Sequence, residues 1–362
     1  MKETNVLSVP YQQLADSPTI RYYTDWKLFD PYIEKPSPPS QLGWSDALLN
    51  TLGLKPDTIL KPGDIQVKPP LSRTDQMRIL AFHANNLNAY SKFLVRDAEF
   101  TILIPKPKEG TLSAHLSLHA EGDSTVNLLL LSEEDSPGLD TITLDVTIDE
   151  TSTLELNYLL FDSRSSPSAI FQEATLPASA TLQTNIVAPR GKMLHIETRN
   201  FLKGPKARAS TKALLAANKG SRITLVTDAE ASAPNNEISV EALGFALEGL
   251  IVHKGFGRAR RGCRDSRLKV GSKAILLSEQ ARAYAAPILE IESDDPLEAS
   301  HSASQSPIDE EQVFYLQSRG FNREEAIAMI VRGLAWGLMG SVAMRRAALQ
   351  KAVELLLKEL AI

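Results

Sequence analysis

The chain has 362 residues, which exceeds one typical domain and predicts two or three folding units or one elongated unit. Hydrophobic residues make up 43% and charged residues 23%, values typical of a globular chain and outside the disordered and collagenous classes. The 39 Lys and Arg residues against 44 Asp and Glu residues give a formal net charge of -5. This balance lacks the overall basic character of a nucleic-acid-binding protein.

The cysteine content excludes several further kinds of site. The single Cys263 excludes an intrachain disulfide, a CxxC redox pair and a multi-cysteine metal site within one subunit. The first residues lack the apolar stretch of a signal peptide, and the longest nearly uncharged apolar stretch, residues 334–344, is shorter than the roughly 20 residues of a membrane span. We therefore expect a soluble cytoplasmic protein with no membrane partner.

The N-terminal region is rich in proline, which breaks any long element into short pieces. Between the prolines, residues 44–52 and 74–92 place apolar positions near helical spacing. We expect a small, partly helical N-terminal region over residues 1–95.

From about residue 97 to residue 292 the apolar pattern changes to a period of two. Short β-branched or leucine-rich runs recur, and turn residues separate them. No long helix-period stretch interrupts these runs, which disfavours a doubly wound nucleotide-binding sheet. A sandwich, a propeller and a parallel β-helix stay open, and the length favours a solenoid core over residues 96–300. The expected strands are residues 101–104, 112–119, 126–131, 142–148, 154–161, 182–187, 223–226 and 238–243.

The pattern changes again after Pro307. Acidic residues at 309–311 suit the first turn of a helix that stops at residues 319–320. Asn322 with Glu325 predicts an N-cap and a second helix that runs to Gly333, and a broad apolar stripe over residues 341–360 predicts a third. We expect a C-terminal helical domain over residues 301–362.

Sequence motifs of known chemistry are sparse. No P-loop, HExxH, GxSxG or zinc-spaced Cys/His cluster occurs, so no ATP site is expected. His115 and His119, four residues apart on one strand face, could be two metal ligands, although we favour imidazoles on a polar strand face. A basic block at residues 254–273 precedes an acidic block at 283–318. These blocks either form an edge for partner docking or pair with each other within the fold.

An ordered string of residues supplies the most specific signal. It comprises Pro-Ile-Leu-Glu-Ile at 287–291, Asp-Asp at 294–295, Ala-Ser-His at 299–301 and Ile-Asp-Glu-Glu-Gln-Val-Phe-Tyr-Leu-Gln-Ser-Arg-Gly at 308–320, after Ile-Leu-Leu-Ser-Glu at 275–279. This string resembles the SufB/SufD family, the core scaffold subunits of the SUF iron-sulfur cluster assembly machine. The resemblance implies a mainly β fold, with a right-handed parallel β-helix flanked by small N-terminal and C-terminal helical domains.

The resemblance also implies a function that is not enzymatic. Family members pair through the end of the β-helix, so the expected mate is a SufB or SufD paralogue or a second copy in a homodimer. Their C-terminal helices carry the ABC-type ATPase SufC, which supplies the missing nucleotide site. The residues implied for SufC binding here are Asp309, Glu310, Gln312, Phe314, Tyr315 and Arg319.

Cluster ligation is implied at the subunit junction, where an iron-sulfur cluster would be held transiently. The histidine of SufD falls on His301, whereas the cysteine and glutamate of SufB fall on Ser272 and Ser302, so the chain is closer to SufD. Cys263 is a weak second candidate: arginine neighbours would favour its thiolate, but it misses the family position and we favour an inert thiol. His301 either binds metal or only forms a hydrogen bond at the interface. One or two ligands cannot close a cluster, so the others must come from the mate.

Two other functions stay open from the sequence. Parallel β-helices also occur as polysaccharide lyases and hydrolases, whose acidic residues line a groove on the solenoid flank. The chain could also be an adaptor for the ATPase without any metal role. The sequence leaves open whether the mate is SufB, SufD or the chain itself.

Overall fold

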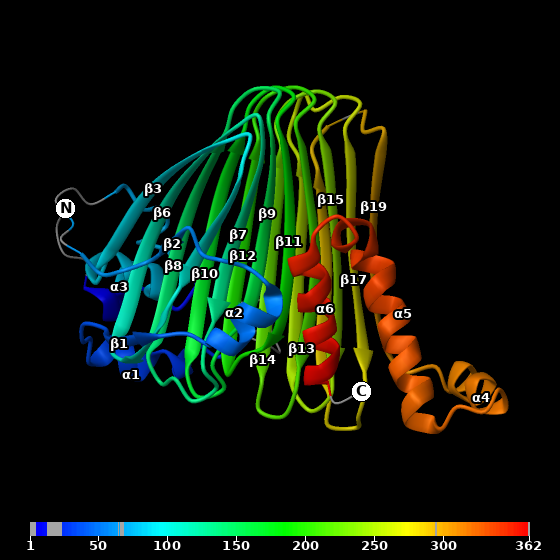
Figure 1. Ribbon diagram of the computed structural model, residues 1–362. Coiled ribbons are helices and arrows are strands. Elements are labelled where there is room, and N and C mark those ends of the chain that lie inside the picture. Colours follow the sequence, from blue (N-terminus) through cyan, green and yellow to red (C-terminus); the bar gives the residue numbers. More distant parts are fainter. Residues whose placement is uncertain (1–4, 13–23, 64, 66–68, 294, 361–362) are drawn as a thin grey trace.

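Two parallel sheets wound into a solenoid form the body of the protein in the computed structural model, which describes residues 5–12, 24–63, 65, 69–293 and 295–360 (Figure 1). The chain makes about eight turns and, from β6 onward, places successive long strands alternately in the two sheets. The expected parallel β-solenoid with helical ends is confirmed.

The eight-stranded sheet runs in the order β18-β16-β14-β12-β10-β8-β6-β3, and the nine-stranded sheet runs β19-β17-β15-β13-β11-β9-β7-β4-β2. The first sheet contains β3 (Ala89–Arg96), β6 (Thr111–Glu121), β8 (Leu139–Ile148), β10 (Pro167–Leu176), β12 (Met193–Leu202), β14 (Arg222–Ala231), β16 (Leu250–Ala259) and β18 (Arg282–Ile291). The second contains β2 (Thr58–Ile59), β4 (Glu99–Ile104), β7 (Asp123–Leu131), β9 (Thr153–Phe161), β11 (Thr181–Arg190), β13 (Arg208–Ala217), β15 (Glu237–Ala246), β17 (Arg267–Leu276) and β19 (Glu298–Pro307). A separate antiparallel pair joins β1 (Ser40–Gly43) to β5 (Lys106–Glu109).

Helices cover both outer faces of the solenoid. The N-terminal elements are η1 (Val6–Ser8), η2 (Trp26–Leu28), α1 (Asp30–Glu34), α2 (Asp46–Leu52) and α3 (Arg78–Asn85), and the C-terminal helices are α4 (Glu310–Ser318), α5 (Arg323–Ala343) and α6 (Ala347–Glu359). Apolar residues of η2, α1 and α3 pack on the eight-stranded sheet, whereas α2, α5 and α6 pack on the nine-stranded sheet. The main core lies between the sheets and is made largely of Leu, Ile, Val and Ala.

Stacked polar residues add hydrogen bonds to this apolar packing. Asn127, Asn157 and Asn185 occupy aligned positions of β7, β9 and β11, and each amide donates to its predecessor, at 3.0 Å for Asn157 and 2.9 Å for Asn185. Asn127 in turn donates to the carboxylate of Glu99 at 2.8 Å. The buried amides are thus paired with one another, as buried polar groups require.

Each of the eight strands expected from alternation is present, but the strands extend beyond residues 96–300 at both ends. Several strands escaped prediction because Ala, Ser, Gly and charged residues occupy them, as in β13, β17 and β19. Stacking on neighbouring coils, rather than their own β propensity, holds these segments extended.

Two helix predictions were wrong in their bounds. The stretch expected to be helical over residues 74–92 is helical only in α3, and Ala89 already begins β3. The capping box of Asn322 and Glu325 is confirmed, but α5 continues through Gly333 to Ala343. Packing of its buried side, which includes Val331 and Ala335, outweighs the glycine's weak helix propensity.

Helix α5 also meets, by length and composition, the requirement for crossing a membrane, with 33% of its most apolar window buried. A single helix of this kind is weak evidence, since a core helix of a soluble protein meets the same requirement. Lys212 of β13 bonds the α5 residues Leu338 and Ser341, each at 3.1 Å, which ties this helix to the solenoid.

Candidate functional site at the last coil

The solenoid ends in a coil whose two strands, β18 and β19, are the outermost strands of their sheets. In the earlier coils most strand residues are buried, whereas most residues of β19 are exposed. Tyr284, Ile291 and Leu297 are exposed apolar side chains on or beside this coil, at 40%, 37% and 55%. The last coil therefore presents an open strand edge and apolar surface, the two features that favour association with another chain.

His301 lies on β19 opposite Val270 of β17 and is exposed. Its Nδ1 atom is 3.1 Å from the carbonyl oxygen of Pro287 on β18. A carbonyl oxygen only accepts, so Nδ1 carries the hydrogen, and in the neutral ring Nε2 keeps its lone pair. This arrangement, with one ring nitrogen fixed by a backbone carbonyl, is typical of histidines that bind metal through the other nitrogen.

The two serines expected at the positions of the SufB cysteine and glutamate lie on adjacent strands. Ser272 on β17 and Ser302 on β19 both line a groove of about 470 Å³ between the nine-stranded sheet and α5. Gly333 and Gly337 of α5 form part of the opposite wall. The structure therefore places His301 at the strand edge and both serines at the α5 groove, where neither offers a cysteine or carboxylate ligand.

Cys263 belongs to the main core and not to the exposed edge. It is fully buried and its thiol donates to the carbonyl of Ala231 at 2.9 Å. Burial raises the pKa of the Cys263 thiol, which disfavours the thiolate that metal ligation needs. This environment favours the inert thiol over a cluster ligand.

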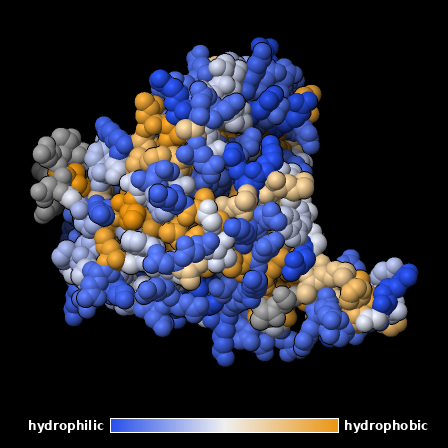
Figure 2. Space-filling view, in the orientation of Figure 1, coloured by the Kyte–Doolittle hydropathy of each residue, from blue (hydrophilic) through white to orange (hydrophobic). Residues whose placement is uncertain are grey.

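Helix α4 stands out from the solenoid and packs against α5 through the buried Val313 (Figure 1). Figure 2 shows this protrusion clear of the sheets, with hydrophobic residues on its surface. Phe314 is 72% and Tyr315 56% exposed, and the guanidinium of Arg319 lies 5.2 Å from the Tyr315 ring centroid. We define Gln312, Phe314, Tyr315 and Arg319 as the α4 surface. Exposed aromatic side chains beside an arginine are the groups that most often anchor protein partners.

The two acidic residues expected beside this surface have partners within the chain. The side chain of Asp309 is the N-cap of α4 and accepts from the backbone of Glu311 at 2.9 Å. Glu310 pairs with Arg323 of α5 through two contacts of 2.7 Å, and this hydrogen bond lowers the pKa of Glu310. Asp309 thus stabilises the start of α4, and Glu310 fixes α4 relative to α5.

The basic and acidic blocks meet partly within the fold. Arg258 on β16 pairs with Glu290 on β18 at 2.8 Å, and Arg260 pairs with Glu292 at 2.7 Å. Desolvation opposes the charge of the half-buried Arg258, but its carboxylate neighbours raise its pKa on balance. For these residues the interpretation of pairing inside the fold is confirmed.

His115 and His119 share a face of β6, as expected, but their environments differ. His115 is buried, and burial lowers its pKa to about 4. His119 is partly exposed and faces the carboxylates of Glu121 and Asp149. The pair itself does not converge on one point. Sequence reasoning missed Asp149. Paired residues of β6 and β8 are 28 positions apart, as are His119 and Thr147, and the same spacing counted from Glu121 would have indicated Asp149.

Comparison with known proteins agrees with this architecture. A family model described as "SUF system FeS cluster assembly, SufBD core domain" matches residues 103–334. The chain is 38% identical over 82 residues to the iron-sulfur cluster assembly protein SufD of Bacillus subtilis (strain 168), covering 23% of this chain and 18% of that protein. It is 31% identical over 137 residues to SufB of the same organism, covering 37% and 29%.

A SufBD family protein of Mycobacterium tuberculosis (strain H37Rv) is 34% identical over 102 residues, which cover 28% of this chain and 12% of that protein. The aligned segments thus span less than a third of the length of these relatives. The family match covers most of the solenoid and reaches into α5. The chain therefore belongs to the SufBD core family of the SUF iron-sulfur cluster assembly system.

Proposed function

We propose that this chain is a SufD-like scaffold subunit that works in the cytoplasm, without catalytic activity of its own. It pairs through β18 and β19 with a SufB-type subunit or with a second copy. A SufC-type ATPase docks on its α4 surface, and a nascent iron-sulfur cluster is carried transiently at the seam. The observation that carries this proposal is the open last coil, which offers His301 with a free Nε2 atom.

Metal binding at His301 requires donors from a second subunit. Among the residues that the structure describes, His301 is in no cluster of three histidine, cysteine or carboxylate ligands. An iron-sulfur cluster normally takes four protein ligands, so one imidazole cannot hold it. The seam between two subunits supplies the rest.

Pairing is tested by charging the exposed apolar residues of the last coil. In the double variant Ile291→Asp, Leu297→Asp, we expect loss of the paired mass in native mass spectrometry after co-expression with SufB, or alone if the mate is a second copy. The control is Leu94→Asp, which alters a residue 60% exposed on β3, at the opposite end of the sheet. An unchanged mass in the double variant would refute pairing through this coil.

ATPase docking is tested by co-purification with SufC at raised salt. Replacing Phe314 and Tyr315 by glutamate should abolish binding, because both rings lose their apolar contact and gain an unpaired charge. Met344→Glu, at an apolar residue 80% exposed beyond α5, is the matched control and should bind normally. Retention of SufC by the double variant would contradict docking on α4.

The cluster role is separated from a pure adaptor role by His301→Ala. Purified anaerobically with its partners, this variant should keep the complex but lose the iron and sulfide found in the wild type. Iron content that stays at the wild-type level would favour the adaptor function. The polysaccharide-active alternative has less support, since flank carboxylates such as Glu173 and Asp228 are paired with arginines.

A further inference from the structure

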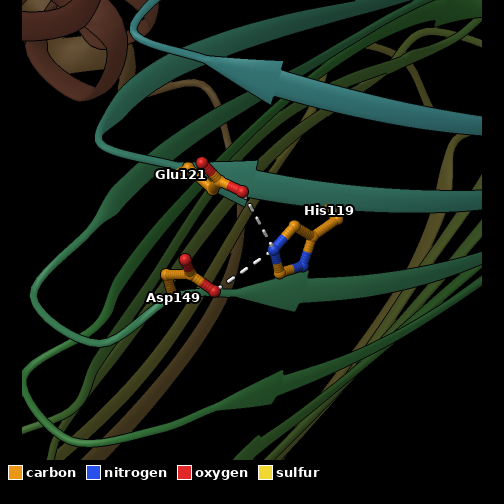
Figure 3. A group of neighbouring side chains, drawn as sticks. All are labelled: His119, Glu121 and Asp149. Carbon is orange, nitrogen blue, oxygen red and sulfur yellow. Dashed lines mark ion pairs between the residues drawn. The ribbon is translucent and has the colours of Figure 1, made fainter.

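A histidine and two carboxylates converge outside the eight-stranded sheet, at the ends of β6 and β8 (Figure 3). His119 lies near the end of β6, Glu121 is its last residue, and Asp149 follows β8 directly. The Nε2 atom of His119 is 3.2 Å from the Asp149 carboxylate and 3.7 Å from that of Glu121. Within the described part of the chain this is the one trio whose ligand atoms all lie within 4.8 Å of one another.

The Nε2 atom of His119 faces the two carboxylates, and the hydrogen bonds of Thr147 determine whether this atom carries a hydrogen or a lone pair. Nδ1 lies 2.8 Å from the hydroxyl oxygen of Thr147. That hydroxyl is placed to donate to the carbonyl of Leu118, at 3.4 Å, so it accepts from Nδ1. In the neutral ring, Nε2 therefore points an unshared electron pair at two negative groups. This contact is repulsive unless a cation, either a proton or a metal ion, lies between them.

Arg96 holds one side of the trio in position. Its guanidinium pairs with Oε2 of Glu121, which leaves Oε1 directed at His119. This ion pair fixes the orientation of the Glu121 carboxylate relative to His119. Thr147 orients the imidazole in the same way that hydrogen-bonded partners orient histidine ligands in metal proteins.

A comparison within the same strand shows what distinguishes this trio. His115, four residues earlier, has an equivalent threonine partner, Thr143 at 2.8 Å, and one carboxylate, Asp145 at 3.5 Å. It is buried, however, and among the described residues no second carboxylate joins it in a three-ligand group. The exposed end of β6 thus combines an accessible imidazole with two carboxylates.

We propose that His119, Glu121 and Asp149 bind a divalent first-row transition metal ion, with water in the remaining positions. One imidazole nitrogen and two carboxylate oxygens suit Zn²⁺, Fe²⁺, Co²⁺ or Mn²⁺. The open outer side leaves room for water ligands and exchange. This site lies towards the β3 end of its sheet, whereas His301 lies at the other end of the solenoid, so the two do not depend on each other.

The test uses the purified full chain after treatment with a chelator. Co²⁺ is titrated by calorimetry and by its visible absorption, and Zn²⁺ is then added in competition. We expect the wild type to bind one equivalent of Co²⁺. His119→Gln and Asp149→Asn each remove a direct ligand and should weaken binding by about 100-fold or more, beyond the loss typical of an outer-shell change. Thr147→Val, which keeps all three ligands, should weaken binding by about tenfold.

Matched controls separate this site from the rest of the surface. Asp145→Asn removes a carboxylate of similar exposure from β8, the strand that Asp149 follows, and His301→Gln removes the imidazole of the last coil. Both variants should still bind one equivalent of Co²⁺. The midpoint of thermal unfolding without metal should be alike in all variants. Absence of Co²⁺ binding in the wild type, as expected if Nε2 carries only a proton, or unchanged binding in His119→Gln, would overturn the proposal.

Discussion

At the scale of single residues, buried charge is concentrated at Lys106 on β5. Its ammonium group is fully buried, 3.3 Å from Asp140 and 3.1 Å from Asp162, and it donates to Ser168 at 2.5 Å. Burial raises the pKa of Asp140 to about 7, against the attraction of Lys106. The single positive charge of Lys106 thus stabilises two carboxyl groups that would otherwise be costly inside the fold.

Lys106→Met should lower the free energy of unfolding by about 3–5 kcal/mol, because it leaves two buried carboxylates without their cation. Adding Asp140→Asn should recover part of the loss. The control is Lys108→Met, two residues along β5, where an exposed lysine pairs with Glu133 at 3.5 Å and the loss should stay below about 1 kcal/mol. Urea unfolding measures all three, and equal losses for both lysines would contradict a specific role of Lys106.

A buried histidine gives the stability a pH dependence. His83 on α3 is 1% exposed and lies 3.0 Å from the Thr141 hydroxyl and 2.9 Å from that of Thr143. Burial, with a smaller effect of His115, lowers its pKa from 6.5 to about 3. The unfolded chain takes up this proton below pH 6.5 and the folded chain does not, so the stability present above 6.5 is lost as the pH falls towards 3.

At two pH units below 6.5, the free energy of unfolding of the wild type should therefore have fallen by about 2.7 kcal/mol relative to that of His83→Gln, which has no imidazole to protonate. Urea unfolding across this pH range measures the difference. Parallel slopes for the wild type and His83→Gln would show that the proton enters the folded state as well.

At the scale of elements, the coils are joined by side-chain ladders as well as by backbone bonds. Asn157 stands in the middle of its amide ladder, where it donates to Asn127 and accepts from Asn185. Asn157→Ala should cost about 1–3 kcal/mol, because both neighbours lose a buried partner. Asn185→Ala, at the end of the ladder, should cost less. Denaturant unfolding compares them, and the reverse order would argue against a cooperative ladder.

At the scale of the whole molecule, stability should vary along the solenoid, since each coil contacts only its neighbours. The middle coils are covered by helices on both faces, whereas β18 and β19 contain no fully buried residue and have a neighbouring strand on one side only. Amide hydrogen exchange should therefore be fastest in these two strands and slowest in β7 to β12. Uniform protection along the chain would contradict this gradient.

Ion pairs run across the eight-stranded sheet and stabilise its last strands, which reduces this difference in stability. Arg199 joins Glu173 at 3.0 Å and Asp228 at 3.7 Å, and Arg258 continues from Asp228 to Glu290 on β18. The arginines therefore connect β10, β12, β14, β16 and β18 in one network, which ties the last coil to the body of the solenoid. Such connected pairs contribute more than isolated surface pairs.

The sequence by itself determined the class of fold, because alternation with a period of two and helix-capping residues are local signals. It also determined the family, through the ordered string that ends at Gly320. It could not locate strands such as β19, whose Ala and Ser residues are extended only because β17 lies beside them. Nor could it extend α5 past Gly333, which packing decided.

The candidate site was likewise indicated in part by the sequence and in part only by the tertiary structure. The string indicated His301 and the aromatic residues of α4, but only the tertiary structure showed Nε2 of His301 free and Phe314 exposed. It also placed Cys263 in the core, which its arginine-rich neighbourhood in the sequence did not indicate. His119 and Asp149 lie 30 residues apart and meet because one coil stacks on the next. Contacts between coils depend on how the chain winds, and that register is a property of the packed core rather than of any local segment.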